Sequence, residues 1–261
     1  MKPAMNVLVC VKQIPDPNTP GKLDPRTKRL VREGDLVLDP GDEHAVEAGL
    51  QLVEKDAGEV TLVSMGPPRA LEAIRRGLAM GAHRGILVTD PELENSDALS
   101  TARAIAGAIK GQQFDLIICG TESTDGSSGA VPAQLAELLG WPLLSFAKKL
   151  EVANGKATID RQTDEGYDVV EAPLPAVVTV TGGINEARYP ALRGIMQAKN
   201  KEVKQLALAE IKLDGQVGKA ALTQEVVEVA PAEARKAGEV IEDKGDGAKR
   251  VADFLKNLKV I

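Results

Sequence analysis

Residues 114–134 read FDLIICGTESTDGSSGAVPAQ and join three kinds of sequence in one short unit. The apolar run at 114–119 predicts a strand that is buried on both faces. A loop of glycines, hydroxyls and carboxylates follows, and apolar residues then recur at helical spacing from Val131 to Leu139, before Gly140. A strand, a loop and a helix in this order are typical of the repeating unit of a parallel sheet.

The same unit recurs upstream of this stretch. Short apolar runs predict strands at 6–11 (NVLVCV), 59–64 (EVTLVS) and 85–89 (GILVT). Helical patterns separate them, with start signals at Asp42 and Asp97 and a stop signal at Gly81. Alternation of this kind requires right-handed crossovers. It therefore predicts an α/β fold with a mostly parallel, doubly wound, Rossmann-like sheet.

The pattern changes after about residue 150. Short strand-like pieces at 150–152, 157–159, 168–171 and 176–181 are separated by the turn signals Asn154-Gly155 and Asp164-Glu165-Gly166. We interpret these four pieces as an antiparallel addition to the sheet.

Two parts are expected along the chain. Residues 1–206 should form the nucleotide-binding domain, and residues 207–261 a polar C-terminal arm. The arm should end in a helix near 247–258, with Val251, Phe254, Leu255 and Leu258 on one face. Such an arm either embraces a partner or folds back on its own domain, and the sequence leaves both open.

Composition excludes several classes of function. The 261 residues carry a net charge of −6 and only 2% aromatic residues, which argues against nucleic-acid binding. No apolar run is long enough for a membrane span or a signal peptide, so we expect a cytoplasmic protein without direct membrane insertion. Neither the cysteines (Cys10, Cys119) nor the histidines (His44, His83) have metal, disulfide or triad spacing, so we assign them no such role.

The loop at 120–134 is the best candidate for a binding site. It follows a strand and precedes a helix, where backbone N–H groups and the helix dipole suit a phosphate. The alternative is an ordinary Gly/Ser turn capped by Asp125 or Ser128. The chain has neither G-x-G-x-x-G after its first strand nor a P-loop, and no hydrolase or metalloprotease motif. We therefore expect no catalytic residues and no metal site.

A second candidate lies at 184–201, which reads INEARYPALRGIMQAKNK. Apolar residues among cations predict a docking surface, with Tyr189, Leu192, Ile195 and Met196 as its contacts. The alternative is a helix that turns its apolar side to the core.

Several motifs together resemble the electron transfer flavoprotein beta family, in order and over nearly the whole chain. The most specific is IDRQTDEGYDVVEAPLPAVVTV at 159–180, and NEARYPALRGIM at 185–196 follows it. The others are VLVCVKQIPD at 7–16, LDPGDEHAVEAGL at 38–50, VSMGP at 63–67, IRRGLAMGAHRGI at 74–86 and GWP at 140–142.

This resemblance implies a heterodimer with an alpha subunit, an FAD held mainly by that subunit, and an AMP in the beta subunit. Electrons would pass from acyl-CoA or other flavin dehydrogenases to a quinone oxidoreductase. Leu192 would anchor the dehydrogenase, supported by Tyr189, Ile195 and Met196. By the same resemblance the AMP pocket comprises Cys10, Asp39, Met65, Gly120, Glu122, Asp125, Gly126, Ser127, Ser128, Gly129, Ala130 and Val131.

Two alternatives remain from the sequence. One is a flavin-bifurcating relative with a second FAD in the AMP pocket, although such relatives tend to carry an acidic-and-threonine loop where this chain has residues 126–129. The other is a stand-alone, universal-stress-type protein that binds an adenine nucleotide, which would leave the motifs at 159–180 and 185–196 without a purpose.

Overall fold

The computed structural model describes residues 4–213, 215–222, 225–230, 238, 240 and 242–261. Its internal contacts divide the chain into two units, Met1–Val226 and Val227–Ile261. The expected division after residue 206 stays a prediction. The second unit contains the helix α6 (Gly247–Asn257) at the expected place.

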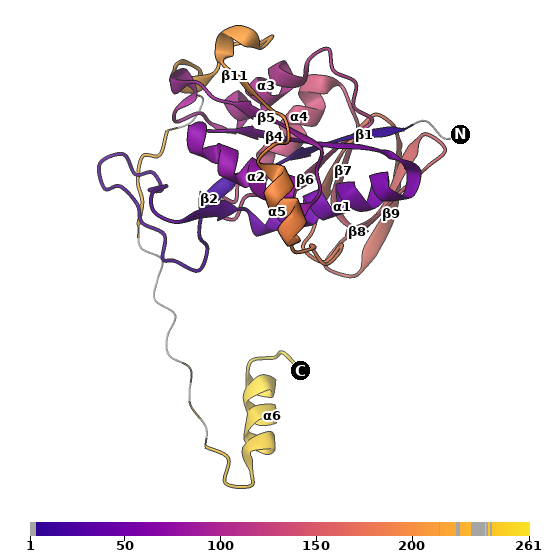
Figure 1. Cartoon of the computed structure of the whole chain (residues 1–261). Helices are drawn as coiled ribbons and strands as arrows, with labels where there is room; N and C mark the ends of the chain where they lie inside the picture. The colour runs from indigo at the N-terminus through magenta and orange to yellow at the C-terminus, as the bar shows by residue number, and fades with distance from the viewer. Residues whose placement is uncertain (1–3, 214, 223–224, 231–237, 239, 241) are drawn as a thin grey trace. The chain divides into compact units, whose positions relative to one another are not determined.

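The first unit is built on a nine-stranded sheet in the described part of the chain, in the order β11-β5-β4-β1-β6-β10-β7-β8-β9 (Figure 1). Neighbouring strands are parallel from β11 to β7, and β7, β8 and β9 are antiparallel. The strands are β1 (Met5–Cys10), β4 (Gly58–Met65), β5 (Arg84–Val88), β6 (Leu116–Gly120), β7 (Leu143–Ala153), β8 (Lys156–Gln162), β9 (Tyr167–Pro173), β10 (Ala176–Val180) and β11 (Val203–Leu206). A separate antiparallel ribbon joins β2 (Gln13–Pro15) and β3 (Leu36–Leu38).

Helices cover both faces of this sheet, which confirms the doubly wound prediction. The apolar cluster on one face includes residues of α1 (Pro40–Asp56), α2 (Leu71–Met80) and α5 (Leu192–Ala198). The cluster on the other face includes residues of α3 (Ala98–Ile109) and α4 (Ala130–Leu139). The predicted helix signals are also found, because Asp97 caps the start of α3 and Gly81 ends α2.

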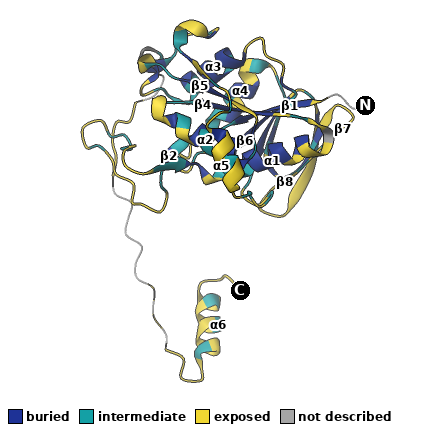
Figure 2. Cartoon of the chain, viewed as in Figure 1, coloured by how far each residue is buried: buried dark blue, intermediate teal, exposed yellow. Residues whose placement is uncertain are grey.

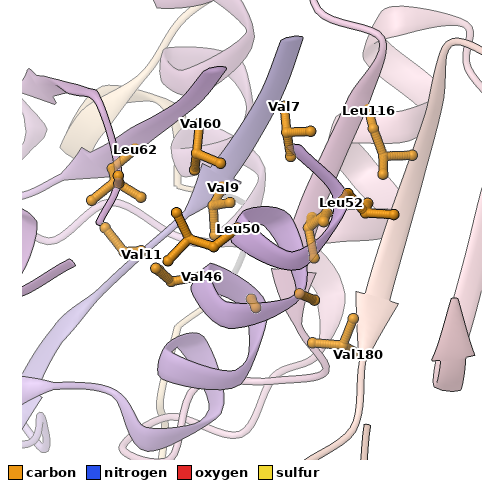
Figure 3. Packing of buried hydrophobic residues seen from close by; sticks show 14 of the residues in the cluster. Val7, Val9, Val11, Val46, Leu50, Leu52, Val60, Leu62, Leu116 and Val180 are labelled. Carbon is orange, nitrogen blue, oxygen red and sulfur yellow. The ribbon is translucent and has the colours of Figure 1, made fainter. Parts of the chain in front are cut away.

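Alternate strand residues supply the two clusters, as the period of a strand requires. In β1, Val7 and Val9 pack against α1, whereas Leu8 lies on the opposite face. Figure 3 shows the first cluster, where Leu50 of α1 lies beside Val9 and Val46 lies beside Val11. Apolar runs that are buried on both faces are the reason that these strands could be predicted.

One predicted piece lies elsewhere than expected. Residues 176–181 were predicted as part of the antiparallel addition, but β10 pairs in parallel with β6 on one side and with β7 on the other. All five residues of β10 are buried. That prediction was wrong because this piece was grouped with the hairpin strands that precede it in the sequence, whereas its continuous apolar run is typical of a central parallel strand. The strand β11 and the ribbon β2–β3 were not predicted.

Burial differs sharply between the sheet and α5 (Figure 2). The central strands are buried, whereas most residues of α5 are exposed. In the other unit, α6 exposes about half of the side chains of Val251 and Phe254. Among the described residues, no helix has the length and the apolar content to cross a membrane.

Candidate functional site

The candidate site lies at the carboxyl ends of β1 and β6. These strands are neighbours, but the chain runs from β1 outward to β4 and β5 before it returns to β6 on the other side. The order of strands thus reverses between them, and open α/β sheets bind ligands at such a point. The predicted residues Cys10 and Gly120 end the two strands.

Asp39 joins the start of α1 to the loop after β6. Its carboxylate is fully buried and accepts hydrogen bonds from Gly41 N at 3.0 Å, Thr124 N at 2.7 Å and Thr124 Oγ1 at 2.8 Å. The first of these bonds caps α1, as expected of an aspartate before a helix. The other two fix the loop, so Asp39 shapes the candidate site through Thr124.

Asp125 joins the same loop to two cations. Its oxygens lie 2.6 Å from Lys12 Nζ and 2.8 Å from Arg32 Nε, and its side chain is almost buried. Burial raises the pKa of Asp125, but hydrogen bonds and charge from Lys12 and Arg32 outweigh it and hold the pKa below its usual value. Asp125 is therefore ionised at neutral pH and is engaged with the cations.

The start of α4 lacks the side-chain cap that the alternative interpretation required. Gly129, its N-cap residue, has the left-handed conformation (φ 58°), and no side chain in the described part of the chain caps this helix. The first N–H groups of a helix have no acceptor within the helix itself. Neither Asp125 nor Ser128 caps this helix, and a helix N-terminus without a side-chain cap is the kind of place where an anion can bind.

An apolar wall lies beside this helix start. The half-buried side chains of Cys10, Met65 and Val131 all pack against the α3–α4 cluster. These three predicted residues come from three separate segments and pack against the same cluster. The Cys10 thiol and burial raise the pKa of Cys119 well above its usual value, so this neighbouring thiol stays protonated and serves as a small apolar residue.

The buried carboxylate of Asp42 leaves little space beside the last residue of β6. Asp42, in the first turn of α1, accepts a hydrogen bond from Lys12 N at 2.7 Å. A Cβ at Gly120 would lie 2.9 Å from Asp42 Oδ1, so only glycine fits there without a shift. Burial and the charge of Asp39 raise the pKa of Asp42 well above its usual range.

The remaining predicted residues form the outer part of the loop. Glu122 and residues 126–129 are exposed, and Ala130 begins α4. Ser127 N donates to Ser123 O at 2.7 Å, and Thr121 Oγ1 donates to Val180 O at 3.0 Å. The first bond closes a turn within the loop, and the second holds the start of the loop against the end of β10.

The second candidate region, residues 184–201, has the exposed apolar side chains that were predicted. Tyr189 is 89% exposed and Leu192 75%, and Ile195 and Met196 are also exposed. Within α5 only Ala198 is buried. The prediction of exposure is confirmed, and the alternative of a helix with its apolar side in the core is wrong.

A cleft of about 320 Å³ lies between the ribbon β2–β3 and the helices α1 and α2. Its wall includes Arg76, which pairs with Glu43 at 3.0 Å and faces the Tyr189 ring at 5.6 Å. None of the twelve residues predicted for the nucleotide lines this cleft, so it is separate from the candidate nucleotide site.

Sequence reasoning missed several residues that build these regions. Lys12 follows the first strand directly, and a cation at that edge is a signal that could have been used. Arg32 and Thr124 carry no comparable signal. Arg32 binds Asp125, which is 93 residues away, and Thr124 binds the buried side chain of Asp39, which is 85 residues away. Arg188, which pairs with α1, was likewise not singled out.

Comparisons with known proteins agree with this architecture. Residues 27–211, more than half of the chain, match the model of the electron transfer flavoprotein domain. A protein of Mycobacterium tuberculosis named electron transfer flavoprotein subunit beta is 44% identical over 98% of this chain and 99% of its own length. Proteins of the same name from Thermoanaerobacterium thermosaccharolyticum and Megasphaera elsdenii are each 37% identical, over 90% and 95% of this chain and 92% and 96% of their own lengths.

Proposed function

Because the chain belongs to the electron transfer flavoprotein family, as a beta subunit with a role in electron transfer, we propose that it pairs with an alpha subunit to form an FAD-containing carrier. In this proposal the beta subunit binds a structural AMP and docks flavin dehydrogenases, acyl-CoA dehydrogenases among them, and the complex passes electrons to a quinone oxidoreductase. The flavin would supply the electron chemistry, so the chain needs no catalytic residues of its own. We expect the complex to work in the cytoplasm.

The observation that carries the AMP proposal is the uncapped start of α4 beside an apolar wall. The phosphate would bind the first N–H groups of α4 and the backbone of residues 126–129. The adenine would lie against Cys10, Met65 and Val131, which are half-buried on one side of the crevice. Gln134 Oε1 in the same helix is buried without a donor among the described residues, so a polar ligand could supply one.

Asp39 and Asp125 would support this site without touching the phosphate. Their oxygens already bind Thr124, Lys12 and Arg32. A carboxylate that is held in this way offers little to an anion, but it fixes the loop that surrounds the anion. A loop fixed before binding reduces the entropy lost on binding.

The observation that carries the docking proposal is the exposure of four large side chains on one short segment. Exposed apolar side chains that are next to each other mark interaction sites more often than solitary ones. Leu192 lies at the start of α5 and would enter an apolar pocket of the dehydrogenase, with Tyr189, Ile195 and Met196 around it.

Nucleotide analysis of the complex tests the first half of the proposal. The chain, purified with its alpha subunit, should release one AMP and one FAD per heterodimer on acid treatment. Two FAD molecules would instead support the bifurcating alternative. A colourless homodimer that holds ATP would support the universal-stress-type alternative and defeat the proposal.

Donor kinetics test the second half. Leu192→Ala should raise the KM for a flavin dehydrogenase donor about tenfold, which corresponds to the loss of one buried contact. The nucleotide content should not change, since Leu192 belongs to a different segment. Wild-type kinetics with a physiological donor would remove Leu192 from the docking role.

A further inference from the structure

Arg188 precedes the exposed apolar segment and crosses to α1. Its guanidinium binds two carboxylates of that helix. It lies 2.6 Å from Glu47 Oε2 through Nε and 3.0 Å from Glu47 Oε1 through Nη2. It also lies 2.6 Å from Glu54 Oε1 through Nη1 and 3.0 Å from Glu54 Oε2 through Nη2. Four bonds from one planar group to two carboxylates leave it a single orientation.

Other side chains hold the two ends of the segment. On the N-terminal side, Asn185 Nδ2 donates to the carbonyl oxygen of His44 at 3.0 Å, and the His44 ring lies 3.0 Å from Asn185 Oδ1. On the C-terminal side, Arg75 donates to the carbonyl oxygens of Ala198 and Lys201 at 2.5 and 2.6 Å.

Lys201 in turn binds the end of α2. Its ammonium donates to the carbonyl oxygens of Leu78 and Ala82, at 2.9 and 2.6 Å, near the end of that helix. The C-terminal end of α5 is thus held by bonds that Arg75 donates from α2 and by bonds that Lys201 donates to the end of α2. The N-terminal end depends on Arg188 and Asn185.

The segment between these ends has little core of its own. Ala198 is the only buried residue of α5, and the helix has seven residues. A helix of that length is marginal in water by itself. Its orientation therefore comes from the polar contacts at its ends and from its close approach to α2, where Gly194 lies against Ala79.

We propose that Arg188 is a positioning residue for docking, which binds Glu47 and Glu54 and so holds Leu192, Ile195 and Met196 in the orientation that the electron donor recognises. This inference rests on the docking function proposed above. It adds that the affinity for the electron donor depends on the ion pairs between Arg188 and α1, although Arg188 itself does not contact the donor. Holding exposed side chains in place before binding lowers the entropy cost of association.

Charge and geometry both select arginine here. Burial raises the pKa of Glu47, but hydrogen bonds from Arg188 and Gln51 and the charge of Arg188 outweigh it and lower the pKa below its usual value. Glu54 is likewise held below its usual pKa, with the hydrogen bond from Arg188 as the largest cause. A lysine offers a point charge in place of a planar fork, so it cannot make the four bonds together.

Kinetics of the heterodimer, purified with its FAD and AMP, test the proposal. Arg188→Met should raise the KM for a flavin dehydrogenase about tenfold, with kcat within twofold of the parent value. Reduction of the bound flavin by dithionite should keep the parent rate, because no docking is needed. Arg188→Lys should give an intermediate KM, and Lys156→Met, which removes a distant pair with Glu171, should leave KM unchanged.

The double variant Glu47→Gln/Arg188→Met separates position from stability. It removes the buried carboxylate that Arg188→Met alone leaves without a cation and, among the described residues, with only Gln51 as a side-chain donor, and so removes the cost of that unpaired charge. A KM that stays raised in this variant supports positioning. A return to the parent KM would overturn it, because the unpaired charge would then be the cause. A parent KM in Arg188→Met alone would also overturn it.

Leu192→Ala distinguishes this inference from the function on which it rests. If Leu192→Ala raises KM and Arg188→Met does not, docking stands and the role of Arg188 fails. If neither variant raises KM, the docking proposal itself fails.

Discussion

The candidate site at the carboxyl ends of β1 and β6, called the crevice below, buries charged side chains. The segment around α5 does the opposite, because it exposes large apolar ones. In the crevice, the carboxylate of Asp39 is fully buried. At α5, the side chain of Leu192 is 75% exposed. Buried carboxylates and exposed large apolar side chains are both unusual, so each region must satisfy its unusual groups in another way.

The two regions differ in how they do so. The carboxylates of the crevice find partners inside the chain, such as Thr124 for Asp39 and Lys12 for Asp125. The large side chains of the segment are instead exposed, and of the four only Tyr189 is recorded with a partner among the described residues, the Arg76 guanidinium over its ring. The carboxylates of the crevice are therefore satisfied by folding alone, whereas the exposed side chains of the segment remain available for the docking contact proposed above.

Helix α1 serves both regions. Its first turn carries Asp42 and follows Asp39, and its later turns carry Glu47 and Glu54, which bind Arg188. Because a helix is rigid over this length, one element places the loop of the crevice and the start of the docking segment. The predictions below test whether the two regions respond to mutation as differently as this comparison requires.

The largest effect is expected at Asp39. Asp39→Ala removes the cap of α1 and both bonds to Thr124, so the free energy of unfolding should fall by about 3 kcal/mol. Asp97→Ala is the matched control, because Asp97 caps α3 through Ser100 N and should cost about 1 kcal/mol. Urea unfolding of both variants measures the difference. Equal losses would show that the bonds to the loop contribute nothing.

Gly194→Ala should destabilise the chain by about 2 kcal/mol, because its Cβ would collide with the carbonyl oxygen of Ala79 and push α5 away from α2. Gly21→Ala is the control, since its Cβ would meet only the Leu30 side chain, at 3.4 Å. Hydrogen exchange of residues 192–198 should accelerate in the first variant alone. Unchanged exchange in Gly194→Ala would mean that α5 does not rely on this approach.

The ion pairs of Asp125 should produce a smaller, pH-dependent effect. Its pKa is lowered in the folded chain, so its stabilisation is present above its unfolded pKa of about 4 and is lost as the pH falls through the folded value. Asp125→Asn should therefore be less stable than the parent at pH 7, by less than about 1 kcal/mol because both cations are partly exposed. The two proteins should converge in acid, and a constant gap between pH 7 and pH 3 would contradict this.

The smallest effect on folding is expected at the docking segment. Leu192→Ala should change the free energy of unfolding by less than about 0.5 kcal/mol, because its side chain is largely in water already. Leu62→Ala, at a fully buried leucine of β4, should cost about 3 kcal/mol. Thermal or urea unfolding gives both values. A loss at Leu192 that approaches the value for Leu62 would show that Leu192 belongs to the core.

Much of the fold could be predicted because local sequence carries it. The strands β1, β4, β5 and β6 are continuous apolar runs, and Asp97 and Gly81 mark the limits of helices next to them. The error at β10 arose because its pairing partners are not specified by its local sequence. The strand follows two hairpin turn signals, at residues 154–155 and 164–166, and nothing in the local sequence says that it inserts between β6 and β7.

The candidate site could be predicted only in part. The loop after β6 is a continuous stretch with its own signal, so its position at the sheet edge followed from the sequence. The contacts that hold it could not be predicted in this way. Lys12 and Asp125 are 113 residues apart, and Arg188 and Glu47 are 141 apart. The sequence contains many possible pairs of opposite charges at such separations, and it does not show which of them form ion pairs.

By itself the sequence determined the alternation of strands and helices, the glycine-rich loop and the family to which the chain belongs. These properties depend on neighbours within one or two turns or strands, where periodicity and backbone preference act. Only the tertiary structure decided that β10 is a central parallel strand, that Asp39 and Asp125 hold the loop, and that α1 holds both regions. Those facts depend on which distant segments meet, because hydrogen bonds and ion pairs act only at contact distance.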